Sequence, residues 1–155
     1  SATPATAPHY GSVKDWAADA WRRLFREMAR RHDVRFVLLG HGREPAFDEP
    51  NVVDLRGRTG FLAMLALVRT RCTALVAPDG GILNAVYFLD AEFPITVVSL
   101  WSDPRQGLLK ARSRSPNPGL VHVPLVGARH DVRGIAPMDV LAALEIAIAP
   151  REGSA

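Results

Sequence analysis

The feature that most constrains the fold is an alternation between short apolar runs and segments whose apolar residues recur with a helical period. Thr73–Ala77 and Ile95–Leu100 show the first pattern, which is typical of strands covered on both faces. Asp15–Arg31 shows the second, with apolar residues on one helical face and arginines on the other. Strands that alternate with single helices favour parallel pairing. The sequence therefore predicts an α/β domain, a three-layer α/β/α Rossmann-like fold with a mainly parallel sheet of about five to six strands.

The same patterns give the expected elements and domain limits. Residues between Trp101 and Leu120 contain several Pro and Gly and are expected to be loop for most of their length. Residues 1–8 are predicted to be a low-complexity linker or chain edge, 9–149 the domain, and 150–155 a tail. The expected strands are Val34–Leu39, Asn51–Leu55, Thr73–Ala77, Ile95–Leu100 and Leu120–Val126, and the expected helices are Asp15–Arg31, Phe61–Val68, Gly81–Leu89 and Pro137–Ile148, with a short further helix between the first two strands.

Size and cysteine content exclude several classes of protein. A chain of 155 residues can bury roughly 70% of the surface that its unfolded form exposes, so it needs no disulfide or structural metal. Cys72 is the single cysteine, which excludes an internal disulfide and a cysteine-based zinc site. No apolar run approaches the roughly 20 residues of a membrane span, and the first residues lack the features of a signal peptide. The default compartment is therefore the cytoplasm.

The formal net charge is +3, and the basic residues form two groups that could meet phosphates or an anionic membrane. For the first group, a solvated helix face is the favoured interpretation. For the second group, two interpretations stay open: a solvated loop and an anion-binding loop. The second group has no aromatic residues interleaved and no nucleic-acid-binding fold signature is recognised, so no nucleic-acid partner is expected. The groups are Arg22, Arg23, Arg26, Arg30 and Arg31, and then Arg105, Lys110, Arg112 and Arg114.

The ends of the predicted strands carry the residues suited to ligand binding. In Asp79-Gly80-Gly81, two glycines follow a strand and open a helix, so backbone amides there are able to approach an anion. The alternative is a helix N-cap formed by Asp79. The Gly40-x-Gly42 pair lacks the third glycine of a dinucleotide-binding fingerprint, which makes a nicotinamide or flavin cofactor a weak hypothesis.

No catalytic or metal constellation stands out. No nucleophile has a recognisable base nearby, so hydrolytic triads receive little weight. The five histidines show no metal-ligand spacing and are interpreted as surface or internally satisfied residues, so neither a metal nor a resident cofactor is expected. The carboxylates at or near strand ends are dispersed along the chain, namely Glu44, Asp54, Asp79 and Asp103.

Five segments, in order, resemble the C-terminal half of the ADP-heptose:lipopolysaccharide heptosyltransferase family. No single segment is specific, but their order and spacing agree with the family from about residue 9 to residue 148. They are His9–Trp16, Asp54–Thr59, Leu75–Gly81, Pro94–Pro104 and Ile135–Leu141.

The resemblance implies one of the two Rossmann-like domains of a GT-B glycosyltransferase, the one that binds a nucleotide-sugar donor such as ADP-heptose. It implies that Lys14, the Gly80 and Gly81 amides and Asn84 meet the donor diphosphate, and that Glu44 and Asp79 meet the ribose and the sugar. It further implies a role in lipopolysaccharide biosynthesis, either in the cytoplasm or at the periphery of the inner membrane. The donor is a substrate, and no metal is expected.

Departures from the family pattern leave a second interpretation open. Asn84 replaces the family's histidine, Gly80 its hydroxyl residue and Ile82 its proline, which removes two donors that would hold a diphosphate. The catalytic carboxylate is expected in an N-terminal acceptor domain, in a longer chain or a partner, so this domain is not expected to transfer sugar alone. The alternative is a non-catalytic Rossmann-like module that binds another protein.

Overall fold

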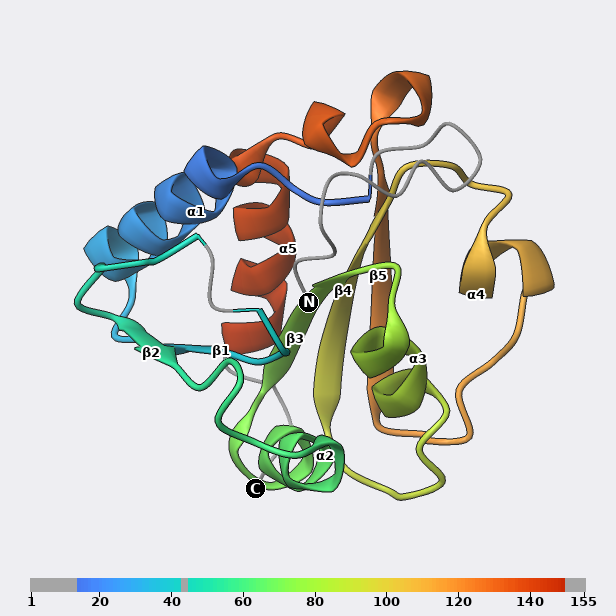
Figure 1. The fold of residues 1–155 in the computed structure, drawn as a ribbon. Coiled ribbons are helices and arrows are strands. Elements are labelled where there is room, and N and C mark those ends of the chain that lie inside the picture. The colour runs from blue at the N-terminus through green and yellow to red at the C-terminus, as the bar shows by residue number, and fades with distance from the viewer. Residues whose placement is uncertain (1–13, 43–44, 150–155) are drawn as a thin grey trace.

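The computed structural model describes residues 14–42 and 45–149, which alternate between helices and strands (Figure 1). The α/β class is as expected. The strands are β1 (Phe36–Leu38), β2 (Val52–Asp54), β3 (Ala74–Pro78), β4 (Ile95–Trp101) and β5 (Leu120–Val126). The helices are α1 (Ala18–Arg31), α2 (Phe61–Arg71), α3 (Gly81–Tyr87), α4 (Gly107–Ala111) and α5 (Pro137–Ile148), with the 3-10 turns η1 (Ala128–His130) and η2 (Val132–Gly134) between β5 and α5.

All strand pairs are parallel, but the strands form two sheets. β1 pairs with β2, while β3, β4 and β5 form a three-stranded sheet in that order. The expectation of one sheet with about five to six strands is therefore wrong, because the described residues form five strands divided between two sheets. Figure 1 shows the two-stranded sheet lying beside α1, apart from the larger sheet.

Side chains of α1 hold the two-stranded sheet in this position. The ring of Phe25, on α1, lies 4.7 Å from that of Phe36 on β1 and 5.4 Å from that of Phe47, measured between centroids. Asn51, just before β2, donates from Nδ2 to the Phe25 carbonyl oxygen at 2.9 Å. The position of β1 is thus set by aromatic packing on a helix, and a strand pattern in the sequence carries no information about such a neighbour.

The larger sheet is covered on both faces, which gives the expected three layers. All seven residues of β4 are buried. Val98 and Leu100 belong to the core shared with α1 and α5, whereas Val97 and Trp101 belong to the core beside α2 and α3. This alternation follows from the pleat of a strand, whose successive side chains point to opposite faces.

Element bounds differ from the expectation at several elements: β1, β2 and α3 are shorter than expected, α2 is longer, and β3 is shifted by one residue. α1 begins at Ala18 because Trp16 is buried and donates from Nε1 to the Ile135 carbonyl oxygen at 3.0 Å. The segment after Trp101 contains the short helix α4, and the described residues between β1 and β2 form no helix. None of the helices in the described part of the chain combines the length and apolar character of a membrane span.

A buried hydrogen-bond chain links β4 to β5. Trp101 Nε1 donates to Ser99 Oγ at 2.6 Å, and the same hydroxyl lies 2.7 Å from His122 Nε2. Because Ser99 accepts from Trp101, its own proton is available to His122. Burial lowers the pKa of His122, so the folded domain favours the neutral ring.

We expect His122 to make the domain sensitive to acid. The unfolded chain takes up a proton on this ring at about pH 6.5, whereas the folded ring resists protonation, so the free energy of unfolding falls as the pH drops below that value. His122→Gln retains an acceptor and removes the titration. Urea unfolding at about pH 7.5 and about pH 5.5 measures the free energy of unfolding at each pH. Between the two, this free energy should fall more for the parent chain than for His122→Gln. Equal losses would contradict this account.

Candidate functional site

The carboxyl end of β3 leads directly into α3 through Asp79 and Gly80. The Asp79 amide donates to the Leu100 carbonyl oxygen at 3.3 Å, which ties this turn to β4. Gly80 is the N-cap residue, its backbone is fully extended, and no side chain caps the helix. The hypothesis that Asp79 is the helix cap is therefore wrong. An added Cβ at Gly81 would meet nothing within 4 Å, so the space beside the helix start is open.

Asp79 instead forms an ion pair with Lys14, 65 positions away in the sequence. Lys14 Nζ lies 2.7 Å from Asp79 Oδ2, and the side chains are 36% and 15% exposed. An ion pair that is partly shielded from water is stronger than one at the open surface. The fold therefore places a cation and a carboxylate together at the end of β3.

Gly107 lies against the other side of Asp79. Its φ is +45°, and a Cβ added there would lie 3.2 Å from Asp79 Oδ1 and 2.6 Å from the ring of Trp101. Only a residue without a side chain fits so close to both groups. The start of α4 thus packs close to Asp79 Oδ1, while Lys14 contacts Oδ2.

Asn84 lies in the first turn of α3. Its Nδ2 donates to the Gly80 carbonyl oxygen at 2.9 Å, and the amide of Asn84 donates to the same oxygen at 3.1 Å. One of its two side-chain N–H groups is thus used within the helix start. The structure therefore brings Lys14, Asp79, Gly80, Gly81 and Asn84 to one strand end, whereas Glu44 lies outside the described residues.

Three other carboxylates are neutralised by a local motif that sequence reasoning missed: Asp54 and Asp103 at strand ends, and Asp131 between η1 and η2. Each accepts a hydrogen bond from the backbone amide and the guanidinium of the arginine two positions later, as Asp-x-Arg. The recurrence of this tripeptide was the available signal. Asp79 has no such arginine, and its cation comes from Lys14, in a distant part of the chain.

Asp103 has a second partner, His130, whose Nδ1 lies 2.8 Å from Asp103 Oδ2. Hydrogen bonds from Arg105 hold the pKa of Asp103 well below its usual range. His130 and the preceding Arg129 both have positive φ values, 59° and 57°. The interpretation of His130 as a histidine satisfied within the protein agrees with this pairing.

The first arginine group lies on α1 and at its end, and most of its side chains are exposed and form ion pairs. Arg22, Arg26, Arg30 and Arg31 contact Asp19, Glu49, Glu27 and Glu145, respectively. In the second group Arg105 faces Asp103. Within residues 14–42 and 45–149, no three His, Cys, Asp or Glu side chains are grouped so that they could hold a metal ion.

Comparison with known proteins identifies one fold. No protein-family model and no curated protein sequence matches the chain. Among solved structures, the chain is similar to the ADP-heptose LPS heptosyltransferase II of E. coli, with a TM-score of 0.61 and 18% sequence identity. The match covers 86% of this chain and 42% of that enzyme, so the chain spans less than half of its length. The described domain therefore has the fold of one part of a GT-B type glycosyltransferase.

Proposed function

We propose that the chain is the donor-binding domain of an inverting, heptosyltransferase-like glycosyltransferase, with a nucleoside-diphosphate sugar as its ligand. The fold and the ion pair at the end of β3 support this proposal together. In open α/β sheets, ligands bind at the carboxyl ends of the strands, which is where Lys14 and Asp79 meet.

The observation that carries the proposal is the Lys14–Asp79 pair itself. Asp54, Asp103 and Asp131 are neutralised by arginines two positions away, whereas Asp79 takes its cation from the segment before α1. Local turn chemistry does not require such a long-range pair. It is suited to a site that contacts an anion and hydroxyl groups side by side, because a cation pairs with the phosphates of a nucleoside-diphosphate sugar and a carboxylate accepts from its sugar hydroxyls.

The proposed roles follow from the chemistry of each group. The ammonium of Lys14 and the amides of Gly80 and Gly81 contact the diphosphate, helped by the N–H of Asn84 that Gly80 does not use. Asp79 contacts hydroxyl groups of the sugar and Glu44 those of the ribose. When the sugar leaves, negative charge grows on the nucleoside diphosphate, and a preorganised cation stabilises that charge.

The catalytic base and the acceptor site are proposed to lie in an N-terminal acceptor domain, in a longer chain or a partner. The described residues would then bind and orient the donor without transferring it. On this proposal the domain works in the cytoplasm near the inner membrane, in lipopolysaccharide biosynthesis, and needs no metal.

A second candidate is a non-catalytic module that associates with another protein. It is favoured by the position of Asn84, whose side chain is bonded to the Gly80 carbonyl oxygen, where the family's histidine would offer a charge to phosphate. Ile82, which stands where the family has proline, lines an apolar pocket. The two candidates differ in whether a nucleotide binds at all.

Nucleotide binding is the decisive prediction. ADP, UDP or GDP at about one hundred times its Kd should stabilise the domain by about 2.7 kcal/mol, which raises the Tm of a domain of this size by about 5 to 10 °C. Lys14→Ala removes a charge-assisted contact worth about 1.5 to 3 kcal/mol and should weaken binding about tenfold or more. Calorimetric titration and thermal melting measure both effects.

Arg69→Ala is the control, because Arg69 is an exposed basic residue in the last turn of α2, outside both basic groups and away from the end of β3. It should bind nucleotide like the parent. If none of the three nucleotides binds below millimolar concentration, the donor-binding function is wrong and the second candidate takes its place.

A further inference from the structure

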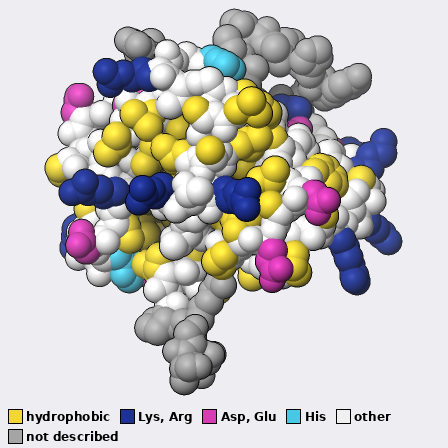
Figure 2. All heavy atoms as spheres, turned by 90° about the horizontal axis from the view of Figure 1, so that it is seen from below, with side chains coloured by type: hydrophobic (Ala, Val, Ile, Leu, Met, Phe, Trp, Pro, Cys, Tyr) yellow, Lys and Arg dark blue, Asp and Glu magenta, His cyan; other side chains and the backbone are white. Residues whose placement is uncertain are grey.

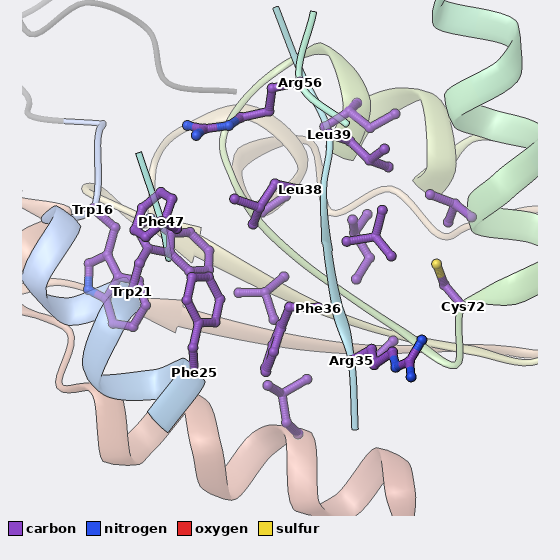
Figure 3. A pocket seen from close by; sticks show the side chains of 18 of the residues that line it. Trp16, Trp21, Phe25, Arg35, Phe36, Leu38, Leu39, Phe47, Arg56 and Cys72 are labelled. Carbon is purple, nitrogen blue, oxygen red and sulfur yellow. The ribbon is translucent and has the colours of Figure 1, made fainter. Parts of the chain in front are cut away.

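A large cavity separates β1 from β3, at the break between the two sheets. Its volume is about 1150 Å³, which exceeds the roughly 300–1,000 Å³ of ordinary small-molecule pockets. Its walls come from α1, α2 and α5 as well as from the two strands. Figure 3 shows aromatic side chains of α1 on one side of it and Cys72 on the other.

The walls of this cavity are mainly apolar. Trp21 and Phe25 of α1 face it together with Phe36 of β1, Leu75 of β3 and Ile148 of α5. Residues of β1 and most of those of β3 are only partly buried, whereas every residue of β4 is fully buried. Part of the surface of β1 and β3, which line the cavity, is therefore left uncovered by the two cores.

Two basic residues of the cavity wall lie just before the starts of β1 and β3. Arg35 and Arg71 line the cavity, are exposed, and have no ion pair within the described residues. Arg56 lies at the opposite end in Figure 3, where Asp54 and the Pro45 carbonyl oxygen both accept hydrogen bonds from it at 2.7 Å. Figure 2, from below, shows basic side chains bordering apolar surface on this side of the molecule.

We propose that this cavity binds a single-chain anionic amphiphile, an acyl or alkyl chain with a carboxylate or phosphate head group. The chain lies among the apolar side chains between β1 and β3, and the head group is held by Arg35 and Arg71. Guanidinium groups suit both kinds of head group, because each can donate two parallel hydrogen bonds to them.

The head group is proposed to bind away from the nucleotide-sugar site, because Arg35 and Arg71 precede β1 and β3, whereas Asp79 follows β3. Lys14, Asp79, Gly80, Gly81 and Asn84 do not line the cavity, but their neighbours Asp15 and Pro78 do, so the cavity borders that site. A nucleoside diphosphate would also fit the cavity poorly, since its phosphates and sugars need many polar partners and the walls are mainly apolar. Nucleotide titration tests the donor site and amphiphile titration tests the cavity, so failure of one proposal can be distinguished from failure of the other.

The test is titration of the whole chain with dodecanoate and dodecyl phosphate, each below its critical micelle concentration. Dodecyltrimethylammonium serves as the cationic match of equal chain length. Calorimetry gives the affinity, and tryptophan emission reports on the site because Trp16 and Trp21 line the cavity. We expect both anions to bind, with affinity falling about threefold to fourfold for each methylene removed, and the cation to bind at least about tenfold more weakly. The two anions distinguish a carboxylate head group from a phosphate.

Variants distinguish the part of the cavity proposed to hold the alkyl chain from the part proposed to hold the head group. The double variant Arg35→Ala, Arg71→Ala should weaken dodecanoate binding about tenfold or more, while Arg69→Ala, an exposed arginine of α2 that does not line the cavity, should bind like the parent. Ala74→Phe places a ring in the cavity and should reduce the binding of every amphiphile. Because the double variant changes only exposed side chains, it decides the outcome even if Ala74→Phe fails to fold.

Equal affinity for anionic and cationic amphiphiles, or for the double variant and the parent, would overturn the assignment of the head group. Binding only above the critical micelle concentration, or none, would overturn the site. Amide hydrogen exchange adds a further check on the amides of β1 and β3 that do not point toward β2 and β4. Slow exchange of these amides without amphiphile would show that β1 and β3 pair directly and leave no cavity.

Discussion

Gly107→Ala is expected to destabilise the domain by about 2 to 5 kcal/mol. The φ of Gly107 is +45°, where a residue with a Cβ is strained. The new methyl group would lie 2.6 Å from Cζ3 of Trp101, a fully buried ring, so either the ring or the α4 loop must move. Urea unfolding measures the loss.

Gly60→Ala is the matched control for this variant. Gly60 precedes α2 with φ of −72°, and an added Cβ there would meet nothing within 4 Å. We expect it to change the free energy of unfolding by less than about 1 kcal/mol. Similar losses in the two variants would show that the packing of Gly107 on Trp101 and Asp79 is not as described.

Asn117→Ala is expected to cost about 3 to 5 kcal/mol. Asn117 is buried and connects the chain entering β4 with the chain entering β5. Its Oδ1 accepts from the Phe93 amide at 3.2 Å and the Gly119 amide at 2.9 Å, and its Nδ2 donates to the Phe93 carbonyl oxygen at 2.8 Å. Alanine would leave these three backbone groups without the side chain that pairs them, and a buried unpaired group costs far more than an exposed one.

Ser115→Ala provides the comparison for Asn117→Ala. Ser115 Oγ donates to the Tyr87 carbonyl oxygen at 2.6 Å and accepts from the Asn117 amide at 3.1 Å, in a partly buried position. Its loss should cost about 1 kcal/mol. Chemical unfolding that ranks Ser115→Ala at or above Asn117→Ala would contradict the assigned role of Asn117.

Element identity followed closely from local sequence patterns. The strand Leu120–Val126 and the helix Pro137–Ile148 have the expected bounds, and β4 extends the expected strand by one residue to Trp101. These segments agree because a pleat or a helical turn is decided by neighbours two to four positions away. Proline at the start of α5 strengthened that prediction, since its fixed φ suits the first helical turn.

Only part of the candidate site could be predicted from the sequence. The likeness to a family directed attention to Lys14, Asp79, Gly80, Gly81 and Asn84, and the structure brings them to one strand end. Local patterns could not pair Lys14 with Asp79, or His130 with Asp103, because the partners are distant in the chain and only the tertiary fold brings them together. Their roles toward a nucleotide sugar stay predictions.

By itself, the sequence determined which segments are strands and helices and that the strands run parallel. Periodicity depends on residues close together in the chain, and a single helix between successive strands favours parallel pairing. Only the tertiary structure decided how the strands are grouped. The packing of Phe25 on Phe36 and Phe47 holds β1 against α1, and this separates β1 from β3 and creates the cavity between them. Such packing depends on three-dimensional contacts among aromatic rings, and any apolar strand pattern is compatible with more than one neighbour.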